Sequence, residues 1–181
     1  MRAAILAAMV VLIPTSAVAT HGGGLHWGGS GERTLVVSED LPASWDGALA
    51  AAVRDWNASP WVHVVVVAGN STCWEFTYPA EFCWSSYQPA PSWIGLSSTW
   101  DDGRGHLRYA VMEANASKTW GEGKRRFVAC HELGHALGLG HSDVGGASCM
   151  NPKLSDVTSW PARPTTHDLG ALTRTYGHAD A

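Results

Sequence analysis

One stretch of eleven residues, residues 131–141, constrains this chain more than any other: it reads HELGHALGLGH. If the stretch begins as a helix, His131 and His135 lie one turn apart on the same face, with Cβ atoms roughly 5–6 Å apart. Gly138 can adopt a positive φ and leave the helix, and the turn that it allows directs His141 toward the same point. The sequence therefore predicts a helix, a sharp turn and three converging imidazoles.

Three imidazoles that meet at one point form a ligand set for Zn²⁺, with Zn–N distances of about 2.0–2.1 Å. Three protein ligands leave a fourth position for water, which is typical of a catalytic zinc site. Glu132 is rotated by roughly 100° from His131, so we expect it to flank the metal as a general base toward a zinc-activated water. The predicted site has His131, His135 and His141 as ligands of one zinc ion and Glu132 as the catalytic residue.

A methionine follows this motif, in the segment Ser148-Cys149-Met150-Asn151-Pro152. HExxHxxGxxH followed by such a methionine resembles the signature of the metzincin metalloproteases, and the string HELGHALGLGHS with MNP after it is most similar to the matrixin branch. The segment HDLGALTRTYG, residues 167–177, is similar to the closing helix of the matrixins. The resemblance covers about residues 33–177 and implies a secreted zinc endopeptidase that hydrolyses peptide bonds of proteins.

The resemblance also assigns roles to single residues. It implies that Met150 packs beneath the metal in a Met-turn and that Asp168 has a structural hydrogen-bonding role. It places Trp160 in the segment that walls the specificity pocket, and an edge strand within residues 93–100 above the cleft. Cys73 is the first cysteine of the sequence, so a short form without the family's cysteine-switch propeptide is expected.

The whole-chain properties fit a single domain. With 181 residues the chain is long enough for a real core, and its formal charge of −4 without a basic run argues against nucleic acid as a partner. We expect a signal peptide over residues 1–19, a flexible Gly-rich lead-in over residues 20–31 and one catalytic domain over residues 32–178. The expected protein is extracellular and monomeric, has no stable membrane insertion, and acts on a protein or peptide substrate.

Four cysteines agree with an oxidising compartment. Four cysteines permit three pairings, and the sequence alone does not choose among them. We favour a Cys73–Cys83 clasp and a Cys130–Cys149 staple, because the Cys130 side chain points about 100° away from the zinc face of the helix. Two free buried thiols are the alternative to the second bridge.

The remaining pattern predicts an α+β (mixed α/β) fold: a twisted sheet with an active-site helix, a Met-turn and a C-terminal helix, as in a metzincin-like zincin domain. Helices are expected from Trp45 to Ala58, with Ser44 as cap, from about Lys124, and after Thr166, ending at Gly177. Residues 61–68 are expected to form a strand buried on both faces, while residues 70–91 are expected to be irregular. Further strands are expected at residues 33–38, 92–99 and 107–113.

Some features carry no assignment. Asp101-Asp102-Gly103 is interpreted as a turn, so calcium is possible there but unsupported. The remaining histidines show no ligand spacing: His21, His26, His63, His106, His167 and His178. Two alternative functions are a catalytically silent zinc-bearing binding module and, because the chain has ten tryptophans, a tryptophan-rich surface- or carbohydrate-binding protein. Glu132 argues against the silent module, because a protein without turnover has no physical need for the base.

Overall fold

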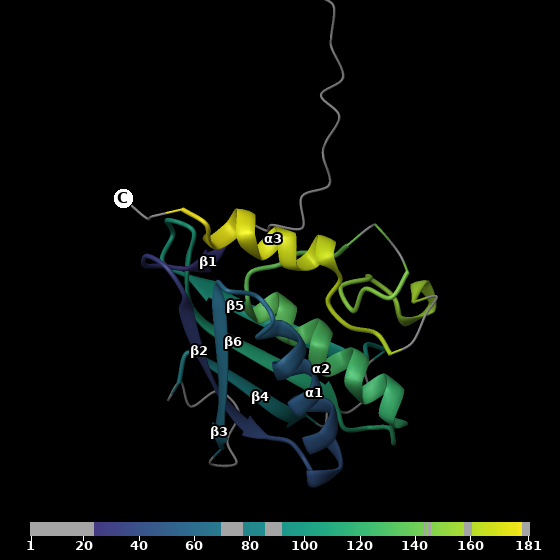
Figure 1. The fold of residues 1–181 in the computed structure, drawn as a ribbon. Helices are drawn as coiled ribbons and strands as arrows, with labels where there is room; N and C mark the ends of the chain where they lie inside the picture. The colour runs from purple at the N-terminus through teal and green to yellow at the C-terminus, as the bar shows by residue number, and fades with distance from the viewer. Residues whose placement is uncertain are drawn as a thin grey trace, which may run out of the picture.

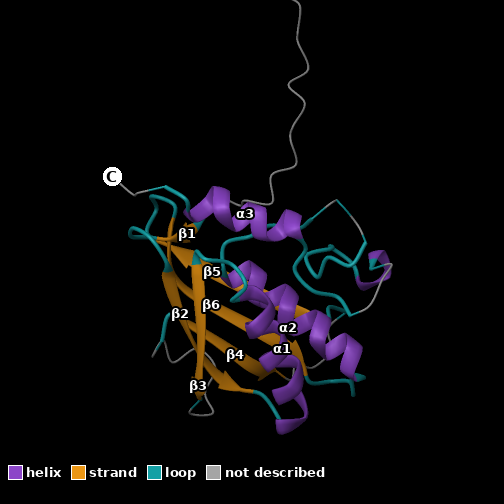
Figure 2. Cartoon of the chain, viewed as in Figure 1, coloured by secondary structure: helices purple, strands orange, loops and turns teal. Residues whose placement is uncertain are grey.

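A twisted sheet with two helices on one face makes up most of the molecule, and a third helix lies across one end of the sheet (Figure 1). The structure is a computed structural model, and it describes residues 24–69, 78–85, 92–142, 144, 146–157 and 161–178. The helices are α1 (Asp46–Trp56), α2 (Glu122–Ala136) and α3 (Thr166–Tyr176). Short 3₁₀ turns lie at Ala43–Trp45 and Leu154–Asp156. Figure 2 shows this separation into a strand layer and a helix layer.

The sheet has the order β1-β6-β4-β2-β3, with β5 paired to β6 outside that path. All pairings are parallel except that of β5 with β6, which is antiparallel. The mixed α/β class predicted from the sequence is confirmed. The strands are β1 (His26–Trp27), β2 (Arg33–Asp40), β3 (Val62–Ala68), β4 (Ala80–Ser85), β5 (Gly95–Asp101) and β6 (His106–Asn115).

The core lies between the sheet and the helices α1 and α2. Alternate residues of β6 and β4 face these helices and are fully buried, among them Phe82, Ala110 and Met112. Trp56 of α1 is also fully buried, and its indole N–H donates to the carbonyl oxygen of Cys130 in α2 at 2.9 Å. A half-buried ion pair between Asp55 and Arg126, 2.9 Å apart, joins the same two helices. These contacts fix the position of α2, the helix that carries His131 and His135.

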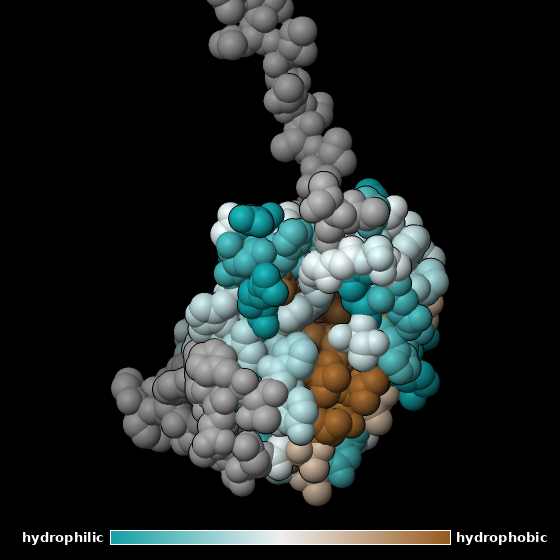
Figure 3. Space-filling model, turned by 90° about the vertical axis from the view of Figure 1, so that its left-hand side faces the viewer, coloured by the Kyte–Doolittle hydropathy of each residue, from teal (hydrophilic) through white to brown (hydrophobic). Residues whose placement is uncertain are grey.

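The structure corrects the expectation for the valine-rich strand. Residues 61–68 were predicted to be buried on both faces, but β3 is an edge strand in which Val62 and Val64 are buried and Val66 is 38 % exposed. A run of apolar residues does not distinguish a central strand from an edge strand whose outer positions are also apolar. Figure 3 shows an apolar area on the side of the molecule where this edge of the sheet lies.

Two strands were missed. β4 lies inside the segment predicted to be irregular, and β1 lies inside the segment predicted to be a flexible lead-in. β1 has only two residues, so periodicity cannot find it. It is held instead by contacts from distant parts of the chain: the Trp27 indole N–H donates to the Ala136 carbonyl at 2.7 Å, and the Trp27 amide donates to the Tyr176 hydroxyl at 3.3 Å. Residues 25–27 are therefore half-buried against the rest of the protein, whereas residues 28–31 are exposed. Residues 20–23 and the predicted signal peptide, residues 1–19, lie outside the described ranges.

The helix ends also differ in detail from the prediction. Ser44 does not cap α1, because a 3₁₀ turn precedes that helix and its N-cap, Trp45, makes no side-chain cap bond. Thr165, not Thr166, caps α3, in a capping box with Asp168. Gly177 ends α3 as predicted, but with φ of −75° instead of a left-handed conformation. None of the helices in the described ranges has both the length and the apolar character needed to cross a membrane.

The indole hydrogen bond between α1 and α2 gives a prediction for stability. Trp56→Phe leaves the buried Cys130 carbonyl without its donor and should lower the free energy of unfolding by about 1–3 kcal/mol, measured by urea denaturation. Trp61→Phe is the matched control, because the half-buried Trp61 indole has no hydrogen-bond acceptor within the described chain. Equal losses in the two variants would contradict the assigned role of this hydrogen bond.

Candidate active site

Three histidines come together at the end of α2 and in the turn that follows. The centroid of the His131 ring lies 4.5 Å from that of His135 and 5.1 Å from that of His141, and the latter two are 4.9 Å apart. Their ligand nitrogens all lie within 4.8 Å of one another, which among the described residues is true of no other group of three or more His, Cys, Asp or Glu. Gly138 has φ of +86°, so the turn uses the conformation that the sequence predicted.

Hydrogen bonds fix the orientation of two of the imidazoles. Nδ1 of His131 lies 2.7 Å from the carbonyl oxygen of Cys149, and Nδ1 of His135 lies 2.8 Å from that of Leu139. A carbonyl oxygen only accepts, so both Nδ1 atoms carry the proton and both Nε2 atoms present a lone pair. The two Nε2 atoms lie 3.0 Å apart.

This arrangement fits a zinc ion. Two Nε2 atoms bound tetrahedrally at about 2.0–2.1 Å from Zn²⁺ would lie roughly 3.3 Å apart, close to the observed separation. Burial lowers the pKa of His131 to about 3, with a further contribution from His135, and burial also lowers the pKa of His135. The imidazoles are therefore neutral near pH 7, which is the state that binds a metal. Two facing lone pairs are repulsive, and a cation between them removes the repulsion.

Glu132 lies beside this group in the same cavity, which has a volume of 730 Å³. Its side chain is buried, and Gly95 at the start of β5 approaches it so closely that a Cβ on Gly95 would lie 2.3 Å from Oε1 of Glu132. Burial, and secondly the charge of Glu113, raises the pKa of Glu132 to about 8. A carboxyl group in this range can both accept and return a proton near neutral pH.

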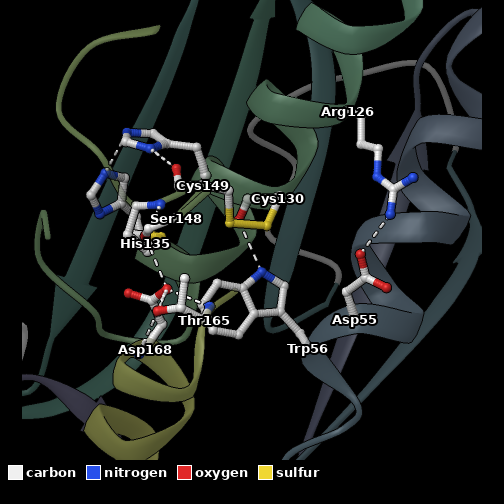
Figure 4. Close-up of a disulfide and its surroundings, with 11 residues drawn as sticks. Asp55, Trp56, Arg126, Cys130, His135, Ser148, Cys149, Thr165 and Asp168 are labelled. Carbon is white, nitrogen blue, oxygen red and sulfur yellow. Dashed lines mark hydrogen bonds and ion pairs between the residues drawn. A yellow bond between two sulfur atoms is a disulfide. The ribbon is translucent and has the colours of Figure 1, made fainter. Parts of the chain in front are cut away.

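Met150, in the turn that follows the histidine motif, packs against α2. The residue is fully buried, and a Cβ on Gly134, which lies between His131 and His135 in α2, would come within 2.2 Å of the Met150 sulfur. The predicted Cys130–Cys149 disulfide is present in the structure, with a Cα–Cα distance of 5.9 Å (Figure 4). The Met150 turn is thus held against α2 by a close apolar contact and by a covalent bond.

A hydrogen-bond network connects the same turn to α3. The Ser148 hydroxyl donates to Oδ2 of Asp168 at 2.9 Å and accepts from the Met150 amide at 3.0 Å. The Thr165 hydroxyl donates to the same Asp168 oxygen at 2.7 Å, as Figure 4 shows. Asp168 therefore joins the capping box of α3 to the turn whose Cys149 carbonyl orients His131, which is the structural role that the resemblance implied.

Several residues of the site were not found from the sequence. The Phe127 ring stacks on His131 with centroids 5.2 Å apart, one turn earlier in α2, and its spacing of four residues could have indicated it. Leu25 lines the cavity, and its carbonyl oxygen approaches Gly138. No sequence signal points to Leu25, because the contact joins segments that are far apart in the chain. Trp160 and Cys73 lie outside the described residues. The structure therefore does not describe the proposed Cys73–Cys83 bridge.

The segment Asp101-Asp102-Gly103 forms a turn, as predicted from the sequence. The Asp101 carboxylate accepts from the Gly103 amide at 2.6 Å, and Oδ1 of Asp102 accepts from the Arg104 amide at 2.9 Å. Gly103 has φ of +76°. Because both carboxylates accept hydrogen bonds from nearby backbone amides, the turn itself explains the two acidic residues.

Comparisons with known proteins agree with this geometry. Residues 97–177 match the matrixin peptidase family. Matrilysin from Rattus norvegicus is 45 % identical over 51 residues, which are 28 % of this chain and 19 % of that protein, so the match spans about a fifth of the relative.

Solved structures extend the likeness beyond the matched segment. A structure of myroilysin aligns with a TM-score of 0.55 at 9 % identity, covering 88 % of this chain and 99 % of the other. A second myroilysin structure gives a TM-score of 0.51 at 11 % identity, covering 86 % and 87 %. At sequence identities of 9–11 %, the likeness to these structures shows a similar fold alone.

The contact beneath the histidines gives a stability prediction with a matched control. Gly134→Ala inserts a methyl group against the Met150 sulfur and Trp56, and should cost about 1–3 kcal/mol of unfolding free energy. Gly170→Ala in α3 meets only the Arg174 guanidinium, at an ordinary 3.6 Å, and should be neutral or stabilising by up to about 1 kcal/mol. Thermal unfolding of both variants measures the difference, and a harmless Gly134→Ala would show that Met150 is not packed there.

The disulfide gives a second prediction. Its two cysteines are separated by 19 residues, so the double variant Cys130→Ala/Cys149→Ala should lose about 3 kcal/mol of stability by loop-closure entropy. The measurement is chemical denaturation of the variant beside the wild type, each with and without a reductant. An unchanged midpoint on reduction of the wild type would contradict this bridge.

The zinc-ligand geometry, the buried methionine that packs against the same helix and the match over residues 97–177 together show that this part of the chain is similar to the matrixin peptidases.

Proposed function

We propose that this protein is a secreted zinc-dependent endopeptidase that hydrolyses peptide bonds of proteins. The observation that carries the proposal is that three imidazoles, a buried carboxyl group and an edge strand line one cavity. The volume of 730 Å³ lies within the range of about 300–1,000 Å³ that is usual for ligand sites. Since the match to matrilysin covers only a fifth of that protein, activity and substrate are inferred from the site itself.

The edge strand β5 supports an extended peptide as substrate. β5 pairs with β6 along one side, and in the described sheet no strand pairs with its other side. Residues 94–97 line the cavity together with His131 and Glu132. A peptide can add to such an edge through main-chain hydrogen bonds, which bind it largely independently of its sequence. The scissile bond would then lie across the three histidines.

Bound zinc, held by His131, His135 and His141, would supply Lewis-acid chemistry by polarising the peptide carbonyl and lowering the pKa of a bound water. Glu132 performs the proton transfers. One of its carboxylate oxygens takes a proton from the water that attacks the carbonyl carbon. The protonated carboxyl group then donates that proton to the departing amine nitrogen as the C–N bond breaks. A raised pKa suits a group that acts first as base and then as acid.

Secretion is part of the proposal and is supported by two observations. Residues 1–19 have the composition of a signal peptide, and the Cys130–Cys149 disulfide is favoured in an oxidising compartment. We further propose that the mature protein is a monomer. Mass spectrometry of the exported chain tests the cleavage after Ala19, which leaves a mature protein that begins at Thr20.

The alternative as a tryptophan-rich binding protein receives little support from the described residues. Within these ranges Trp100 is the one exposed tryptophan, at 39 %, whereas Trp45, Trp56 and Trp120 are buried. Trp74 and Trp160 lie outside the described ranges. A binding surface of coplanar indole rings needs several exposed rings together, and the described chain offers one.

The central test separates metal binding from turnover. Glu132→Gln should keep one zinc ion per chain, because the residue is not a ligand, but should lower the hydrolysis of unfolded casein by at least about a thousandfold, since base and metal act as a unit. Metal analysis and a casein assay on the same preparations measure both quantities. Zinc in both proteins with hydrolysis in neither would favour the silent binding module.

Metal removal gives a complementary test. A chelator should abolish hydrolysis in the wild type and added Zn²⁺ should restore it, whereas His141→Ala should retain zinc more weakly, because only two imidazoles remain. The control is His63→Ala, an exposed histidine on β3. Activity that survives complete removal of zinc would overturn the proposed function.

A further inference from the structure

The lysines of this chain lie together beside the catalytic cavity. The sequence contains only Lys118, Lys124 and Lys153. Lys118 and Lys124 line a second hollow, of 540 Å³, at the start of α2. Lys153 lines the catalytic cavity, and Leu154 lines both the cavity and the hollow, so the two are adjacent. A chain with a formal charge of −4 thus gathers all of its lysines at one end of the proposed active site.

These lysines have no carboxylate partner within the described ranges. No ion pair there involves Lys118, Lys124 or Lys153, and all three residues are exposed. The neighbouring Arg125, by contrast, is paired with Glu122 at 2.9 Å. Glu122 is the only carboxylate among the residues that line the hollow, and this pair neutralises it. The positive charge of the three ammonium groups is therefore left for a ligand.

An indole ring holds two of the lysines in place. Nζ of Lys124 lies 5.1 Å, and Nζ of Lys118 5.9 Å, from the centroid of the Trp120 ring. Both distances suit a cation–π contact. The Trp120 side chain is buried, and its N–H donates to the Asn115 carbonyl at 2.9 Å, which fixes the ring. Two cations beside one ring repel each other, and an anion close to both offsets that repulsion.

The lysines lie where an extended peptide would leave the cavity. Gly95, at the start of β5, lies against Val128 and Glu132 in the middle of α2. A peptide that continues past Gly95 runs toward the first turns of this helix. Lys124 lies roughly two helical turns before His131, or about 10 Å along the axis of α2. An extended peptide advances by about 3.3 Å per residue, so it reaches the lysines about three residues from the bond that lies across the histidines.

We propose that Lys118, Lys124 and Lys153 form a specificity site for acidic polypeptide substrates. Asp or Glu side chains about three residues to one side of the scissile bond pair with the three ammonium groups. Among the described residues that line the catalytic cavity, Lys153 is the only lysine or arginine, so the preference concerns this one side. The inference rests on the proposed peptidase function and names its substrate class. A polypeptide is the partner because the hollow adjoins a cavity whose edge strand can bind a main chain.

Peptide hydrolysis by the zinc-loaded wild type tests the preference. One set of peptides shares an apolar centre and carries Asp, Ser or Lys at the positions that follow it, and a second set carries them at the positions that precede it. In one set, kcat/KM of the Asp peptide should exceed that of the Lys peptide by about tenfold, since several exposed ion pairs each contribute a small factor. High salt should reduce this ratio. In the other set, the three peptides should be cleaved alike.

Lysine variants assign the preference to this site. Lys118→Gln/Lys124→Gln should remove most of the difference between the Asp and Lys peptides. Lys118→Arg/Lys124→Arg retains both charges and should retain the difference. Arg174→Gln is the matched control, because it removes a positive charge on α3 from a residue that does not line the cavity. The substituted side chains are exposed, so the variants are expected to fold normally.

Binding separates this inference from the proposed function. In fluorescence anisotropy, the zinc-loaded Glu132→Gln variant should bind the labelled Asp peptide about tenfold more tightly than the Lys peptide. If the wild type cleaves no peptide but this difference in affinity is present, the peptidase proposal fails and the acidic-peptide site stands. Cleavage and binding that do not distinguish Asp from Lys would overturn the lysine site and leave the peptidase proposal intact. Binding of dextran sulfate without any preference among the peptides would also overturn it, in favour of an anionic polysaccharide.

Discussion

The site depends on one constraint: two imidazoles must present their Nε2 lone pairs to the same point. They do so because carbonyl oxygens of Cys149 and Leu139 accept from the two Nδ1 atoms and so fix which nitrogen carries the proton. The helix alone would set the spacing of His131 and His135 but would leave the rings able to turn about their side-chain bonds. With the rings fixed, the two Nε2 atoms face each other at 3.0 Å, an arrangement that is stable with a cation between them.

The rest of the structure explains why these carbonyls are in place. The Cys149 carbonyl belongs to the Met150 turn, which is tied to α2 by the disulfide and by the fit of Met150 against Gly134. The same turn is tied to α3 through Ser148 and Asp168. The Leu139 carbonyl follows Gly138, and that turn is covered by Leu25 and by the hydrogen bonds of Trp27 and Tyr176 to the last carbonyls of α2. The segment around β1 and the helix α3 therefore both support the orientation of the zinc ligands.

The sequence predicted the part of this arrangement that is local. The motif placed three histidines, a positive φ at Gly138 and a carboxyl group beside them, because helix geometry and glycine stereochemistry act over a few residues. It missed β1, the contact of Leu25 with the turn and the approach of Gly95 to Glu132, since each joins segments far apart in the chain. It also misjudged β3, whose valines look like those of a central strand although the strand is at the edge.

X-ray absorption at the zinc edge, on protein loaded with one equivalent of zinc, tests the central claim most directly. The account predicts three imidazole nitrogens and one oxygen at about 2.0–2.1 Å, with no sulfur, since Cys130 and Cys149 are joined to each other. A zinc–sulfur distance of about 2.3 Å, or fewer than three imidazoles around the ion, would contradict the claim that the three imidazoles of this helix and turn form a catalytic zinc site.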